Sequence, residues 1–86
     1  MLIENDKLTI SKIRDIYKEL QEEFDLSNHI IVDLKNVDEI DLSGLQLLIS
    51  LKKSCELENK KLELLNIKDS LMHSFELSGT DSVLEV

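Results

Sequence analysis

Short segments with the period of a β-strand alternate with longer segments with the period of a helix along the whole chain. Strand-like residues occupy positions 2–4, 7–10, 29–34, 61–67 and 82–86. Apolar residues spaced by three and four follow Ser11, Ser43 and Asp69, as in amphipathic helices. The order β-β-α-β-α-β-α-β predicts an α/β fold, in which a small mixed sheet of four to five strands is flanked by helices.

The boundaries of the helices follow from residues that favour helix ends. Ser11 is a plausible N-cap for a first helix of about fourteen residues. The second helix, after Ser43, is apolar around much of its circumference and should end near residues 58–59. Asp69 or Ser70 can cap the third helix, and Gly79 stands where a left-handed residue commonly ends one.

The strands differ in how deeply they should be buried. The β-branched run at 29–34 is almost continuously apolar, which predicts a central strand buried on both faces. The first two strands flank Asn5 and Asp6, so they could pair as a hairpin. Segment 35–42 has no long period, although Val37 and Ile40 are spaced to fold a loop onto the core.

Length and charge limit the classes of protein that this chain can represent. Eighty-six residues suffice for a single domain, 1–86. The net charge of −8 opposes binding to nucleic acid or to anionic lipid headgroups. A lone cysteine, Cys55, cannot form an internal disulfide, and no signal peptide or membrane-spanning run is apparent. We therefore expect a cytoplasmic protein with no nucleic-acid partner and no membrane insertion.

The chain offers few groups for catalysis. With Gly44 and Gly79 as its only glycines, it has no glycine-rich phosphate loop. His29 and His73 lie in separate elements without the spacing of metal ligands. Asp33, Asp38 and Asp41 could hold Mg²⁺, but acidic loop residues are more often simply solvated. We expect no enzyme activity, no cofactor and no metal.

The segment from Asp41 to Gln46 joins a loop to the start of the second helix, where open α/β sheets often carry function. Ser43 and Gln46 have the spacing of a capping box, in which Ser43 would be the N-cap. Alternatively, an exposed Ser43 hydroxyl could be phosphorylated, adding about −1.5 to −2 charge beside Asp41. The two roles are compatible, since a hydroxyl can cap the helix until a kinase modifies it.

The same segment resembles the signature of the STAS domain family, the sulfate transporter and anti-sigma factor antagonist family. The resemblance is carried by Val32-Asp33-Leu34, Val37 and Ile40-Asp41-Leu42-Ser43-Gly44-Leu45, and the other segments agree in order. It implies a small mixed sheet flanked by helices. In anti-sigma factor antagonists the second residue after the motif aspartate is phosphorylated by a partner kinase, and that position is Ser43 here.

Other branches of the family imply other roles. STAS subunits of lipid-transport ABC complexes carry a hydroxyl at the position of Leu42, so this chain departs from them. Short stand-alone STAS proteins near chemotaxis kinases resemble Asp41 through Leu48 closely. The alternative function is thus a constitutive subunit of a chemotaxis-kinase-associated or ABC lipid-transport complex, with Ser43 only capping the helix.

The favoured prediction is a non-catalytic module that binds a regulatory serine kinase or an anti-sigma-like protein, with the affinity switched by phosphorylation of Ser43. A homodimer is the second kind of partner that we consider. The predicted partner-binding residues lie around the loop and the start of the second helix: Asp38, Asp41, Leu42, Ser43, Gly44 and Gln46.

Overall fold

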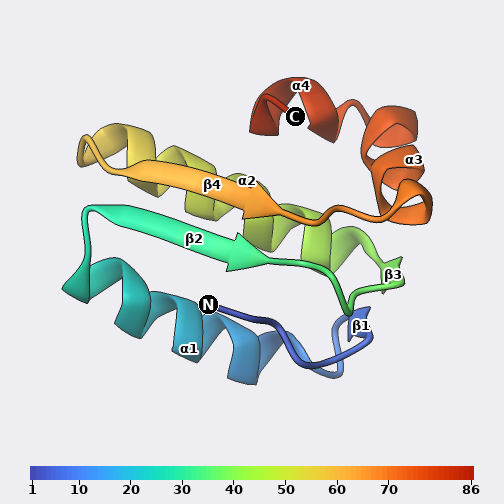
Figure 1. The fold of residues 1–86 in the computed structure, drawn as a ribbon, viewed down its shortest axis with the longest axis horizontal. Coiled ribbons are helices and arrows are strands. Elements are labelled where there is room, and N and C mark those ends of the chain that lie inside the picture. Colours follow the sequence, from blue (N-terminus) through green and yellow to red (C-terminus); the bar gives the residue numbers. More distant parts are fainter.

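The computed structural model describes residues 1–86 and contains four helices and four short strands (Figure 1). In chain order these are β1 (Lys7–Leu8), α1 (Ile13–Leu26), β2 (His29–Asp33), β3 (Glu39–Ile40), α2 (Leu42–Leu57), β4 (Lys61–Leu65), α3 (Asp69–Ser78) and α4 (Thr80–Leu84). The α/β class and the three helices predicted from the sequence are confirmed. No helix combines the length and the apolar character that crossing a membrane requires.

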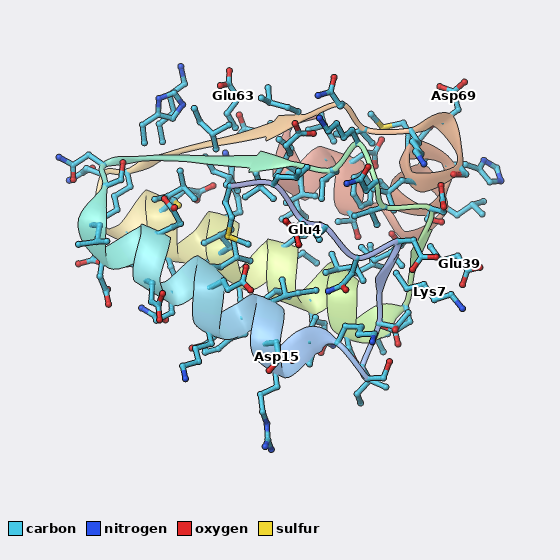
Figure 2. The ribbon with its side chains drawn as sticks, turned by 60° about the horizontal axis from the view of Figure 1, so that its bottom comes forward. Glu4, Lys7, Asp15, Glu39, Glu63 and Asp69 are labelled. Atoms are coloured by element: carbon cyan, nitrogen blue, oxygen red, sulfur yellow. The ribbon has the colours of Figure 1, made fainter.

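The strands form two small sheets, and every pairing is parallel. β2 pairs with β4, with Ile30 opposite Leu62 and Val32 opposite Leu64. On the other side of β2, the Ile3 amide donates to the Asp33 carbonyl at 3.1 Å. This bridge and β4 flank β2, which confirms its central position. β1 and β3 form the second pair, across which Lys7 Nζ lies 4.0 Å from Glu39 Oε2 (Figure 2).

Only one face of β2 is buried, so the prediction of burial on both faces is wrong. Ile30 and Val32 are buried, whereas His29 and Ile31 are exposed. Figure 2 shows α1 and α2 together on one side of the sheet, while Glu63 of β4 points away from them. The apolar Ile31 made the strand look continuous in the sequence, although its side chain is on the uncovered face.

The core lies between the sheet and the helices and contains 16 buried apolar residues. α1 contributes Ile16, Leu20 and Phe24, at the three-to-four spacing that predicted the helix. α2 contributes more residues: Leu47, Leu48, Leu51 and Cys55. Val37 is fully buried, as predicted for the loop before β3.

The predicted N-terminal hairpin does not form. Residues 2–4 contribute an isolated bridge to Asp33, and β1 pairs with β3 instead. The Asp6 carbonyl accepts hydrogen bonds from the amides of Asp38 and Glu39, at 2.8 and 3.3 Å. These long-range bonds use the backbone that a local hairpin would need.

The C-terminal residues form a helix and not the predicted strand. Gly79 has the left-handed backbone expected of it, with φ of 76°, and joins α3 directly to α4. Thr80 and Leu84 are buried, and Ser78 Oγ lies 2.8 Å from Thr80 Oγ1. A single helical turn therefore brings both side chains to the core, where an extended segment would place them farther apart.

Lys60 links the end of α1 to the start of β4. Its ammonium donates to the Phe24 carbonyl and lies 4.2 Å from the centre of the Phe24 ring. α1 has no basic residue in its own last turn. Lys60 thus supplies the positive charge that the C-terminal end of a helix favours.

Candidate functional site

The candidate site lies where β1 and β3 end and α2 begins, and Asp41 organises it. Asp41 is the N-cap of α2, and its Oδ1 accepts a hydrogen bond from the Gly44 amide at 3.1 Å. Its Oδ2 accepts from the Ile10 amide at 3.0 Å. These two bonds hold the pKa of Asp41 below its usual value, Ile10 having the larger effect. Asp41 is therefore ionised at neutral pH.

Ser43 does not cap the helix, so the predicted capping box is wrong. It is the second residue of α2, its side chain is half-buried, and its Oγ makes no hydrogen bond within the protein. Gln46 is exposed and does not reach back to the helix start. Asp41 takes the capping role because its carboxylate bonds the Gly44 amide, three residues later, and the Ile10 amide together.

Gly44 is buried and packs against β1 and β3. A Cβ atom at this position would lie 2.2 Å from the Leu8 carbonyl oxygen and 2.6 Å from Ile40 Cγ1. The absence of a side chain thus lets α2 begin in contact with both strands. Gly44 was predicted to touch a partner, but it is inside the protein and supports the surface from behind.

The other predicted contact residues reach the surface to different degrees. Leu42 is 68% exposed, and Gln46 is exposed one turn further along α2. Asp38 is exposed and forms an ion pair with Lys68 at the start of α3. Leu42, Gln46 and the half-buried Ser43 therefore lie together at the N-terminus of α2, and Asp38 lies beside the start of α3.

Two further residues join this surface from the N-terminal part of the chain. Ile10 is 71% exposed and is tied to the site by the bond from its amide to Asp41. Arg14, in the first turn of α1, lines a shallow depression that it shares with Ser43 and Gln46. Sequence reasoning missed both, because Ile10 was assigned to a strand and a single arginine in an amphipathic helix gives no signal.

The candidate metal ligands do not come together. Asp33 Oδ1 accepts from Asn66 Nδ2 at 3.1 Å and from the Lys35 amide at 3.0 Å, which lowers the pKa of Asp33. Asp38 and Asp41 are engaged separately, as described above. No group of three or more His, Cys, Asp or Glu side chains is arranged to hold a metal ion.

Cys55 is buried in the core on α2. Burial raises the pKa of its thiol, which opposes formation of the nucleophilic thiolate. Cys55 therefore acts as a small apolar residue in the packing of α2.

Comparison with known proteins agrees with this architecture. The STAS domain model matches residues 4–86. An anti-sigma-B factor antagonist of Staphylococcus aureus is 26% identical over 83 residues, which cover 96% of this chain and 75% of that protein.

Two solved structures share the fold. A sulfate transporter family protein from Wolinella succinogenes superposes with a TM-score of 0.78 at 22% identity, and the protein TM1081 superposes with 0.79 at 20%. Each match covers 98% of this chain and 68% of the other. Because the family match spans nearly every residue, the chain belongs to the STAS domain family.

Proposed function

We propose that this protein is a non-catalytic regulatory module that works as anti-sigma factor antagonists do. In its unmodified form it binds an anti-sigma-like protein or a regulatory serine kinase, and phosphorylation of Ser43 weakens that binding. The similarity to the anti-sigma-B factor antagonist supports an antagonist-like role. The position of Ser43 supports the switch.

The observation that carries the proposal is the free hydroxyl of Ser43 at the start of α2. Ser43 Oγ has no hydrogen-bond partner in the protein, and the helix cap is provided by Asp41. A kinase can therefore modify Ser43 without removing a bond that the fold needs. Exposed Leu42 and Ile10 beside it offer apolar area for a partner.

The charge of a phosphate on Ser43 would remain at the surface. A phosphate near a helix N-terminus is normally attracted to the free amides of the first turn. Here the Asp41 carboxylate already accepts from the Gly44 amide and carries a negative charge of its own. The added charge of about −1.5 to −2 would thus face the partner and lower its affinity while the fold remains intact.

The partner-binding surface that we propose consists of Asp38, Asp41, Leu42, Ser43 and Gln46, with Gly44 supporting it from inside. Leu42 provides the apolar centre, since it is the one large apolar residue of this set and its side chain is exposed. The acidic residues favour a partner with basic groups around an apolar contact.

The first experiment is the intact mass of the protein isolated from its native cells, with peptide mapping of residues 36–52. We expect a fraction that carries one phosphate, located on Ser43. A kinase or anti-sigma-like protein encoded nearby is then titrated against wild type and against the Ser43→Asp and Ser43→Ala variants. Ser43→Asp should bind at least about tenfold more weakly, as expected when a charge is introduced at an interface, and Ser43→Ala should bind like wild type.

The matched control is Ser82→Asp, which adds the same charge at an exposed serine of α4. It should leave the affinity unchanged. Equal binding of Ser43→Asp and wild type would refute the switch. Lack of phosphate under several growth conditions would favour a constitutive subunit of a larger complex.

A further inference from the structure

A groove runs between α1 and α2 on the side of the helices that faces away from the sheet. Its deeper part has a volume of about 320 Å³ and lies between the C-terminal halves of the two helices. It continues into the shallow depression beside Ser43 through shared residues, Tyr17, Leu47 and Ser50. Six apolar side chains line the deeper part: Tyr17, Leu20, Phe24, Leu47, Leu51 and Leu57.

Large apolar side chains stand exposed around this groove. Tyr17 is 54% exposed and Leu57 is 85% exposed, and both contribute to its walls. An open groove with such margins is suited to a protein surface, because a small molecule would leave the exposed Leu57 in water.

The two ends of the groove carry opposite charges. Arg14 lies at the end where α2 begins, and Glu58 lies where α2 has ended. At 1.5 Å per residue, the length of α2 places these ends about 22 Å apart. Neither Arg14 nor Glu58 takes part in an ion pair within the protein.

We infer that two copies of this chain pack these grooved faces against each other as a symmetric antiparallel dimer. A two-fold axis across the middle of the groove reverses the direction of the helices. It brings Arg14 of each copy to the same end as Glu58 of the other. Both ends of the interface then join opposite charges, and the deeper apolar half of each groove lies against the shallow half of the other.

A contact of standard size would cover a small share of the molecular surface. A standard interface buries about 800 Å² on each partner, which is roughly a seventh of the 5372 Å² surface of this chain. The net charge of −8 on each copy opposes association at low salt. The dimer should therefore tighten between roughly 20 and 200 mM salt, as screening shortens the reach of that repulsion.

The test is the mass of the full chain in solution, by sedimentation equilibrium up to about 1 mM at physiological salt. Wild type should approach twice its 9.9 kDa mass as its concentration rises. Arg14→Glu and Glu58→Arg should each weaken the dimer at least about tenfold, because each places like charges together at both ends. The double variant restores both pairs and should return to within about threefold of wild type.

Two controls separate this contact from a general effect of charge or hydrophobicity. Lys18→Glu changes the net charge as Arg14→Glu does, but Lys18 does not line the groove. Leu77→Ser removes a leucine of α3 that is 76% exposed, for comparison with Leu57→Ser. Both controls should dimerise like wild type, and Leu57→Ser should not.

A wild type that stays monomeric throughout overturns the inference, as does a dimer that survives both charge reversals. A monomer whose groove binds an amphipathic helical peptide would also overturn it and would identify a different occupant. The measurement uses no partner and no phosphorylation, so its failure is distinct from failure of the proposed function.

Discussion

Asp41 joins two distant parts of the chain with one carboxylate. One oxygen caps α2 and the other holds the Ile10 amide after β1. Ser43, although better placed in the sequence pattern, is left without an internal bond. At the residue scale, the structural role and the proposed regulatory role thus belong to two side chains.

This division can be measured by denaturation in urea. Asp41→Ala should lower the free energy of unfolding, because it leaves the Gly44 and Ile10 amides without their acceptor. Ser43→Ala should change it by less than about 0.5 kcal/mol, as expected of a side chain without an internal partner. Equal losses for the two variants would contradict the assignment of the cap.

The lowered pKa of Asp41 also predicts how stability depends on pH. A group whose pKa is lower in the folded state stabilises the protein above its unfolded pKa, and the stabilisation is lost as pH falls through the folded value. The unfolding midpoint in urea should thus decline below the usual aspartate value of 3.8. Asp41→Asn, which keeps a capping oxygen, should show a shallower decline as pH falls below this value. An identical decline would indicate that other carboxylates control the acid limit.

At the scale of elements, the start of α2 is fixed by its close approach to β1 and β3. Gly44 permits this approach, since the Leu8 carbonyl occupies the space of a side chain. The strands that support the site have only two residues each, so contact with α2 helps to hold them in place.

Substitution of the two glycines separates packing from backbone conformation. Gly44→Ala should cost about 2–3 kcal/mol or more through overpacking, despite the better helix propensity of alanine. Gly79→Ala has open space around it and should cost only about 1 kcal/mol, for its left-handed φ. Circular dichroism during urea denaturation compares the two. A smaller loss of unfolding free energy for Gly44→Ala than for Gly79→Ala would mean that α2 can shift away from the strands with little loss of stability.

At the scale of the whole molecule, one face of the sheet packs against the helices and the other remains open. Val32 and Ile31 are neighbours on β2 and differ in which face they occupy. Val32 is fully buried, while Ile31 is 37% exposed.

Matched substitutions test this layering. Val32→Thr should cost about 1–3 kcal/mol, because a hydroxyl enters the core without a partner. Ile31→Thr should cost less than about 1 kcal/mol, as is usual for surface positions. The unfolding free energies of the two variants are compared by denaturation. A larger loss for Ile31→Thr than for Val32→Thr would mean that Ile31, and not Val32, faces the core.

The sequence was sufficient to predict the long helices, whose apolar spacing repeats over several turns. The spacing of Ile16, Leu20 and Phe24 predicted α1, and the apolar run of α2 predicted its burial. Short elements were predicted less well, because two to five residues carry too little periodicity. Residues 82–86 contain the strand-favouring Val83 and Val86, yet burial of Leu84 and Thr80 favours a helical turn.

The sequence predicted that a helix begins near Ser43, but it did not reveal the contacts that fix this start. The motif located the start of α2, whereas the identity of the cap depended on Ile10, which is distant in sequence. The contribution of Arg14 depended on how α1 lies beside α2. Neither the bond between Ile10 and Asp41 nor the position of Arg14 beside α2 can be recognised from neighbouring residues in the sequence.

The bridge from Lys60 to Phe24 makes the end of α1 depend on the segment that leads into β4. The last turn of α1 obtains its only cation from a residue 36 positions later, so it is incomplete until the turn before β4 has formed. Amide hydrogens at the end of α1 should therefore exchange with solvent at the rate of those in β4, as one cooperative unit. Lys60→Met should let the end of α1 exchange earlier, so that the helix frays independently of the sheet.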